Sequence, residues 1–476
     1  MRTIDVAPLP LSELESHLDE VASHRLNGGI EAARVLLEGR TVWTVTPSAA
    51  AGSGPAETVA PLVGYALGLG IDVRWLALDA PADFVRVAAR LHAGIHGDRG
   101  DGGKLGEKQR DLYEHVLASN AENVTEDVRE GDVVILHDPP TAGLARSLKR
   151  AGLTVIWRCH LGGGPSGVAA ERSWAFLDRY LEDVDLVIVS REEYRPAFIE
   201  PERCVVVAPS VNPDSPKNRV LDLDEAWSVA RLAGIYDGER PFEAVPFVHE
   251  DGRPDAIRSM PSLAGAGLPV PTGVRTIAQV GRWDRLKGAE ELIEAFATNL
   301  TALPGDAHLL IVGPEPDPNR DEAAAAYLGE VLDRWDLLPE SVSRRVHIAA
   351  VPTYDREVNA TVVNAVQRVA DVVTQRSLVE AFGLPVAEAM WKKAPVVASA
   401  VGGIQDQIVN GIDGVLVDPA DASTWAQAVV DLLRLPQRAR EMGLAAHESV
   451  RREFLPDRHL RETAGAIDRA LELHAD

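Results

Sequence analysis

The chain has 476 residues, of which 46% are hydrophobic and 25% are charged. This length suits roughly two to three domains of ~150–200 residues, and the composition is that of a folded globular protein. Asp and Glu number 72 against 48 for Lys and Arg, which gives a formal net charge of -24. This excess of negative charge repels nucleic acids and anionic membranes. An anionic ligand would therefore need a local basic pocket.

The chain carries no recognisable targeting or membrane signal. Its N-terminus lacks the basic start and apolar run of a signal peptide, and no stretch of ~18 uncharged apolar residues occurs. Cys159 and Cys204 have no metal-type spacing and form no disulfide framework, although a single bridge between them remains open. We expect a cytoplasmic protein that contacts neither nucleic acid nor membrane, and a homodimer is compatible with the sequence.

Short apolar runs rich in Val and Ile alternate with helical spacing, which predicts βαβ units. The first half has six predicted strands, at 41–49, 72–78, 133–138, 154–160, 186–190 and 204–211. The second half has six more, at 276–282, 308–313, 346–351, 371–375, 395–402 and 414–418. Such apolar strands are buried on both faces, and ligands bind beyond their C-terminal ends. We therefore predict an α/β fold of two Rossmann-like domains whose parallel sheets face a central cleft.

The Pro- and Asn-containing stretch 208–219 interrupts this alternation and is the predicted hinge. It separates a first domain over 1–215 from a second over 216–455, and a C-terminal helix over 456–476 is expected to pack back on the first domain. A second irregular stretch, 247–273, is predicted to be a surface excursion of the second domain.

The first candidate site is the loop SAAAGSGPAE after the first strand. Gly52 and Gly54, with Ser53 between them, allow a ligand to approach the backbone closely, and the following helix N-terminus attracts anions. A tight βα turn without function is an equal alternative. Further along, Asp138 and His160 end two strands, where they can hydrogen-bond a carbohydrate, whereas His137 precedes them as a structural residue. No HExxH motif or Cys/His quartet occurs, so we predict no metal.

The segment QVGRWDRLKG gives a stronger signal. Arg282 ends a strand and Lys287 follows five residues later, where a helix begins. Two cations at such a point can clamp a diphosphate, because Arg offers a planar fork of donors and Lys a point charge. The alternative is a solvated run of charges, which is how we interpret Arg285.

A third signal surrounds the apolar turn AFGLPVA. Phe382, Gly383 and Leu384 would present backbone N–H groups at a new helix, Glu380 could accept hydrogen bonds from sugar hydroxyls, and Glu388 could bind a ribose diol. On the alternative view Glu380 is a helix cap and Glu388 a surface residue. The spacing gains weight because it follows the Arg/Lys pair.

The combination of R-x4-K, then E-x7-E around FGLP, then AVGGIQDQI resembles the retaining nucleotide-sugar glycosyltransferases of GT-B fold. Within these, SAAAGSGPAE, VILHDPP, WRCHLG and PSVNPDSPKN extend the resemblance over nearly the whole chain to trehalose synthases of the glycosyltransferring type. The resemblance implies transfer of glucose from a nucleotide-diphosphate glucose to glucose. No cofactor is implied, and the partners are the nucleotide sugar and a small sugar acceptor.

By this resemblance, Arg282 and Lys287 hold the donor diphosphate and Glu388 holds the ribose. The transferred glucose would meet Glu380 together with the backbone of 382–384. His160 would lie near the reacting face of the glucose, and Asp138 would position the acceptor.

The resemblance also gives the loop of Gly52, Ser53 and Gly54 the role of covering the phosphates, although relatives commonly carry a Gly-Gly-Val-like loop there. A second departure follows His160, where the family pattern continues with an acidic residue and this chain has Leu161 and Gly162.

The resemblance leaves several alternatives open. A trehalose phosphorylase would use the same pocket with inorganic phosphate, and a retaining transferase could serve a secondary-metabolite acceptor. A non-enzymatic two-lobed sugar-binding protein is disfavoured by the cation and Glu set. A dehydrogenase is disfavoured because GSGPAE departs from GxGxxG at its last position.

Overall fold

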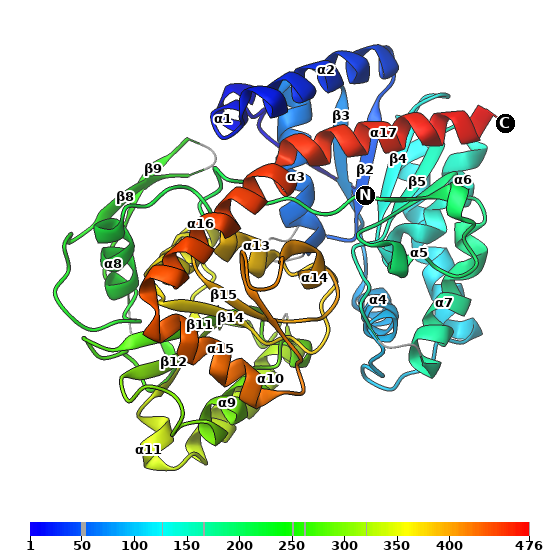
Figure 1. Ribbon diagram of the computed structural model, residues 1–476. Helices are drawn as coiled ribbons and strands as arrows, with labels where there is room; N and C mark the ends of the chain where they lie inside the picture. The colour runs from blue at the N-terminus through cyan, green and yellow to red at the C-terminus, as the bar shows by residue number, and fades with distance from the viewer. Residues whose placement is uncertain are drawn as a thin grey trace. The chain divides into compact units, whose positions relative to one another are not determined.

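The computed structural model describes residues 1–48, 54–125, 127–164, 167–249, 252–260, 263–319 and 321–475 (Figure 1). The chain forms two compact units. Unit 1 comprises Met1–Ser210 and Phe454–Asp476, and unit 2 comprises Val211–Glu453. These limits lie a few residues from the predicted boundaries after residues 215 and 455.

Unit 1 consists of helices around one sheet. Its elements are β1 (Arg2–Ile4), α1 (Leu11–Glu15), α2 (Glu20–Leu36), β2 (Val42–Thr46), α3 (Gly54–Gly68), β3 (Val73–Ala77), α4 (Ala82–Ile95), α5 (Glu107–Thr125), β4 (Val133–His137), η1 (Pro139–Leu144), α6 (Ala145–Arg150), β5 (Thr154–Arg158), α7 (Val168–Leu181), β6 (Leu186–Val189), η2 (Glu192–Tyr194), η3 (Pro201–Arg203), β7 (Cys204–Val206) and the C-terminal α17 (Pro456–Ala475).

The unit 1 sheet has the strand order β1-β3-β2-β4-β5-β6-β7. β2 to β7 are parallel, as predicted, whereas β1 pairs antiparallel with β3. The sequence did not predict β1, because this three-residue edge strand is mostly exposed and lacks an apolar run. α17 contacts α2, α3, β5 and β6, and its Ala466 and Ile467 complete a buried cluster with Ile135 and Ile156 of the sheet.

Unit 2 has the same general plan. Its elements are α8 (Leu223–Leu232), β8 (Val245–Val248), β9 (Pro254–Ile257), β10 (Ala264–Ala266), β11 (Arg275–Val280), η4 (Arg285–Lys287), α9 (Ala289–Thr298), β12 (Ala307–Pro314), α10 (Glu322–Asp336), α11 (Glu340–Ser343), β13 (Val346–Val351), α12 (Arg356–Val369), β14 (Val372–Gln375), α13 (Leu384–Trp391), β15 (Val396–Ser399), α14 (Ile404–Gln407), β16 (Val415–Val417), α15 (Ala422–Arg434) and α16 (Pro436–Glu453).

The unit 2 sheet has the order β10-β13-β12-β11-β14-β15-β16, with only β10 antiparallel. The stretch 247–273 is therefore only partly a surface excursion. It contributes to a β8–β9 hairpin, and its β10 joins the edge of the sheet. A Cβ on Gly265 would lie 2.0 Å from the backbone oxygen of Ile348, so this strand has no room for the side chain that an apolar pattern requires.

In each sheet the chain reverses its direction of travel once. In unit 1 it runs outward from β2 to β3 and returns to β4 on the other side of β2, and in unit 2 it does the same from β11 through β12 and β13 to β14. Ligands of open α/β sheets bind beyond the strand ends at such a switch point. The two candidate positions are therefore the loops after β2 and β4 and the loops after β11 and β14.

The structure also bears on the two cysteines and on membrane-spanning helices. Both Cys159 and Cys204 are free thiols. Within the described residues, every helix is too short or too polar to cross a membrane.

The start of α9 requires a glycine. Gly288 has φ of 67°, and a Cβ there would lie 2.3 Å from the backbone oxygen of Arg376. We expect Gly288→Ala to lower the free energy of unfolding by about 2–4 kcal/mol, from left-handed strain and overpacking together. Gly411→Ala is the matched control, because φ is 81° there and a Cβ would meet nothing within 4 Å. Equal losses in denaturant unfolding would contradict this close approach.

Candidate functional site

The loops after β11 and β14 are tied together by backbone and amide hydrogen bonds. The Gln279 side chain donates from Nε2 to the backbone oxygen of Lys287 (3.0 Å) and accepts at Oε1 from the N–H of Arg376 (2.8 Å). The N–H of Leu378 donates to the oxygen of Leu286 (2.8 Å). These contacts explain how residues far apart in sequence reach one place at the unit 2 switch point.

This arrangement brings Lys287 against Glu380. Lys287 Nζ lies 2.5 Å from Glu380 Oε2, and the two side chains are only 13% and 10% exposed. Ser377 Oγ donates to the same carboxylate oxygen (3.1 Å) and accepts in turn from Gln375 Nε2 (3.0 Å). The mostly buried ammonium is therefore neutralised and its partner is held by a second donor. Glu380 is therefore the ion-pair partner of Lys287.

The turn after Glu380 is closely packed. Gly383 has φ of 91° and precedes α13, which begins with Leu384 and carries Pro in its first turn. Phe382 is buried, and its backbone oxygen accepts from Gln407 Nε2 (2.5 Å). The N-cap residue of α13, Gly383, has no side chain with which to cap the helix. Its N–H groups and positive end of the helix dipole can therefore serve a ligand oxygen.

Glu388 lies in the second turn of α13 and is buried, so it is not a surface residue. Its Oε1 lies 3.4 Å from Nζ of Lys217 in the predicted hinge segment. Lys392 of the next turn donates to Asn218 Oδ1 and Gln367 Oε1, both at 2.8 Å. Burial lowers the pKa of Lys392 to about 7, and Glu388 opposes this shift. Glu388 thus lies in a set of charges fixed by both the helix and the hinge.

Arg282 and Lys287 differ in exposure and in partner. The Arg282 side chain is 56% exposed, and its guanidinium lies 3.8 Å from the carboxylate of Asp284. The nearby Arg285 pairs with Glu290 and Glu330. The predicted pair of converging cations is therefore one paired lysine and one solvent-facing arginine.

In unit 1 the site residues form a chain of hydrogen bonds at the β2/β4 switch point. Thr44 Oγ1 lies 2.9 Å from His137 Nε2, and His137 Nδ1 lies 2.8 Å from His160 Nε2. The backbone N–H of His160 donates to Asp138 Oδ1 (2.7 Å). His137, Asp138 and His160 are thus brought together at the ends of β4 and β5. The buried Asp138 carboxyl holds the backbone of His160.

Burial sets the charges of this cluster. It lowers the pKa of His137 to about 3 and that of His160 well below its ordinary value, and the nearby Arg158 adds to both shifts. Burial also raises the pKa of Asp138 to about 7. The imidazoles are therefore neutral at neutral pH. They are suited to hydrogen-bonding hydroxyl groups and unsuited to acting as cationic acids.

The same cluster forms one end of a cavity of about 120 Å³. Thr44, His137, Arg158, His160 and His459 line it together with apolar side chains of α2, α3 and α17. Three of these residues, Thr44, Arg158 and His459, were not predicted from the sequence. Arg158 could have been found as the single charge within a buried strand, whereas His459 comes from α17, some 300 residues away in the chain.

After His160 this chain has glycines where the family pattern has an acidic residue, and the structure leaves no room for a side chain at two of them. A Cβ on Gly162 would lie 2.4 Å from the ring of Tyr194, and one on Gly164 would lie 2.3 Å from the backbone of His96. The acidic side chain expected at this point would therefore collide with Tyr194. Gly52 and Ser53 lie outside the described residues, and Gly54 is the first residue of α3.

Comparison with known proteins shows the class. Residues 266–449 match the family Glycosyl transferases group 1. An alpha,alpha-trehalose-phosphate synthase (UDP-forming) from Burkholderia xenovorans, solved in complex with glucose-6-phosphate, has a similar fold, with a TM-score of 0.63, 16% identity and coverage of 91% of this chain and 100% of that one. The chain is a glycosyltransferase of GT-B fold, with two parallel-sheet α/β domains.

The family is shown by closer relatives. Residues 45–196 match the family Trehalose synthase, N-terminal domain. Trehalose synthase of Pyrococcus horikoshii is 31% identical over 425 residues, which cover 89% of this chain and 88% of the relative. Trehalose synthase of Rubrobacter xylanophilus is 31% identical over 458 residues, covering 94% and 92%. The chain belongs to the trehalose synthase family.

The neutral state of His137 predicts how stability depends on pH. The folded chain resists protonation of His137 down to about pH 3, whereas an unfolded His accepts a proton near pH 6.5. The free energy of unfolding is therefore unaffected by the titration of His137 above about pH 6.5. It decreases as the pH falls from there toward 3, because the unfolded chain then binds a proton that the folded chain does not. Glutamine at position 137 can still form hydrogen bonds but does not take up a proton. We therefore expect His137→Gln to reduce the slope of the unfolding free energy against pH by about 1.4 kcal/mol per pH unit between about pH 4 and 6.

The exposed His24 provides the control. His24→Gln replaces a histidine at an exposed position and should leave the unfolding free energy at neutral pH close to that of the wild type. A wild-type slope in His137→Gln would show that His137 is protonated in the folded chain.

Proposed function

We propose that the chain transfers glucose from a nucleotide-diphosphate glucose to a second glucose, making trehalose with retention of configuration. The trehalose synthase relatives, matched over most of their length, support the product. The ion pair between Lys287 and Glu380 at the unit 2 switch point is the observation that carries the proposal. It supplies one group for phosphate and one for sugar hydroxyls at the same place.

On the donor side, Lys287 and Arg282 would neutralise the diphosphate. Lys287 is already positioned, and its ammonium would be shared between Glu380 and a phosphate oxygen. Arg282 has a solvent-exposed side chain with a long contact to Asp284, so turning toward a phosphate would break little. Its planar fork would then bind two phosphate oxygens.

The sugar parts of the donor would be held by hydrogen bonds. Glu380 would accept from hydroxyls of the transferred glucose, while the N–H groups of 382–384 would donate to it. Glu388 would bind the ribose diol, with Lys217 keeping its carboxylate ionised. His160, neutral and oriented by Asp138 and His137, would hydrogen-bond the glucose near its reacting carbon.

Two roles rest on the family resemblance. The loop of Gly52, Ser53 and Gly54 would cover the phosphates. The Asp138 carboxyl is buried and accepts a hydrogen bond from the backbone N–H of His160. Asp138 would therefore position the acceptor indirectly, by fixing His160.

In the proposed reaction an acceptor hydroxyl attacks the anomeric carbon from the face that the diphosphate leaves. The bond from the anomeric carbon to the diphosphate oxygen breaks, the bond to the acceptor oxygen forms, and the departing diphosphate takes the hydroxyl proton. Configuration is retained because both bonds lie on one face. Catalysis would then consist of placing the two sugars and stabilising charge on the leaving group, which needs no metal.

The two cations give the sharpest mutational test. We expect Lys287→Ala and Arg282→Ala each to lower kcat by about 100- to 1000-fold, since a preorganised donor to developing charge contributes about 3–4 kcal/mol. Arg285→Ala is the matched control, because Arg285 pairs with Glu290 and Glu330. Unchanged circular dichroism would show that the variants fold. Near-normal turnover of the Arg282 and Lys287 variants would overturn their assignment.

The reaction itself can be tested with UDP-, ADP- and GDP-glucose, each incubated with glucose. We expect one nucleotide diphosphate to be released together with trehalose. Cleavage of trehalose by inorganic phosphate without a nucleotide would instead establish a phosphorylase. Nucleotide release that requires an acceptor other than glucose would refute glucose as the acceptor.

A further inference from the structure

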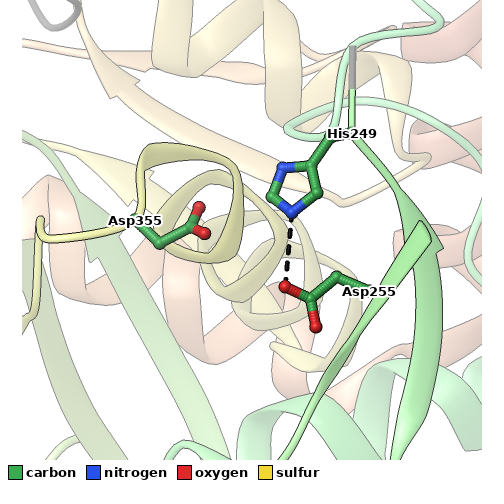
Figure 2. A group of neighbouring side chains, drawn as sticks. All are labelled: His249, Asp255 and Asp355. Atoms are coloured by element: carbon green, nitrogen blue, oxygen red, sulfur yellow. Dashed lines mark hydrogen bonds and ion pairs between the residues drawn. The ribbon is translucent and has the colours of Figure 1, made fainter. Parts of the chain in front are cut away.

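A second cluster of chemically active side chains lies in unit 2, on other elements. His249 follows β8, Asp255 lies on β9, and Asp355 precedes α12 as its N-cap. One ligand atom from each of the three lies within 4.8 Å of the others. Figure 2 shows the two carboxylates and the imidazole turned toward one another.

The imidazole is oriented as in a metal site. His249 is 3% exposed, and its Nε2 lies 3.4 Å from Asp255 Oδ2, a separation that suits two ligands of one cation with bonds of about 2.0–2.2 Å. Its Nδ1 lies 3.2 Å from Glu357 Oε1. Metal-binding histidines commonly donate their second N–H to a carboxylate in this way, which fixes the ring. Glu357 would be such a positioning residue.

The two aspartates are fixed by the backbone. Asp355 Oδ1 accepts from the N–H groups of Glu357 (3.0 Å) and Val358 (3.1 Å), and Asp255 Oδ1 accepts from that of Ala256 (2.7 Å). Each carboxylate is therefore oriented by at least one hydrogen bond from the backbone. The ligand atoms are held in place by secondary structure.

We propose that His249, Asp255 and Asp355 bind a divalent transition-metal cation of the Zn²⁺ type, which joins the β8–β9 hairpin to the N-terminus of α12. One imidazole with two carboxylates suits such an ion, with water completing its coordination. Arg253 and Arg258 approach Asp255 at 3.7 and 3.4 Å and offset part of the negative charge. The site is separate from the residues assigned to glycosyl transfer and does not depend on that assignment.

Protons compete with the metal cation for the imidazole of His249. Burial opposes a charge on His249, but the carboxylates of Asp255 and Glu357 outweigh it and raise the pKa of the imidazole. The proposal departs from the expectation of no metal, which rested on contiguous motifs. Here Asp355 lies 100 residues beyond Asp255 in the chain.

The test uses the full chain, freed of affinity tag and treated with chelator, and Zn²⁺ as the probe in isothermal titration calorimetry. We expect one equivalent to bind, and Asp255→Asn and Asp355→Asn each to weaken binding at least about tenfold, because a charged ligand is lost. Both variants can keep their backbone hydrogen bonds, since Asn accepts as Asp does. Asp421→Asn is the matched control, because Asp421 caps α15 through Ser423 and Thr424 in the same pattern.

Thermal unfolding gives a second readout. Zn²⁺ at about a hundredfold excess over Kd should raise the melting temperature of the wild type and of Asp421→Asn by several degrees. It should raise that of Asp355→Asn by about half as much or less, since the same Zn²⁺ concentration is then at most about tenfold over the weakened Kd. The proposal is overturned if the wild type binds no stoichiometric Zn²⁺, or if Asp255→Asn and Asp355→Asn bind it as tightly as the control.

Discussion

The ion pair between Lys287 and Glu380 is the contact on which the account of unit 2 depends. A lysine ammonium that is mostly buried is stable only with a charged or hydrogen-bonding partner. The pair is possible because Gln279 and the backbone of 286–288 bind the loop after β14. Sheet topology, through the switch point between β11 and β14, places these two loops side by side. The fold thus produces the pair, which holds a cation at the unit 2 switch point.

The polar groups at the unit 1 switch point differ from those of unit 2 in their charge. Those of unit 1 are buried around Arg158, and burial keeps His137 and His160 neutral. Neutral imidazoles hydrogen-bond hydroxyl groups without adding charge, which fits contact with a sugar better than with a phosphate. The chain thus offers charged groups in unit 2, where we place the diphosphate, and uncharged polar groups in unit 1, where we place sugar hydroxyls.

Much of the fold follows from the sequence. All twelve predicted parallel strands are present, because Val- and Ile-rich runs buried on both faces give an unambiguous signal. The two antiparallel edge strands, β1 and β10, were missed because each has three residues and little apolar surface. Asp138 and His160 do follow the ends of β4 and β5, but their contacts with each other and with His137 were seen only in the structure.

The side-chain partners could not be predicted in the same way. Local spacing singled out Arg282 and Lys287, but it did not reveal that Lys287 pairs with Glu380, which lies 93 residues further along the chain. The metal-type cluster of His249, Asp255 and Asp355 likewise spans a hairpin and a helix start. Contacts of this kind depend on the packing of whole elements, and motif spacing along the chain does not encode them.

The most direct measurement of the central claim is a crystal structure of the protein with an unreactive nucleotide-diphosphate glucose. The account predicts that Nζ of Lys287 lies within hydrogen-bonding distance of a phosphate oxygen, with the Arg282 guanidinium turned to the same diphosphate and Glu380 on the glucose. A donor whose phosphorus atoms lie far from both cations, with Arg282 still in solvent, would contradict it.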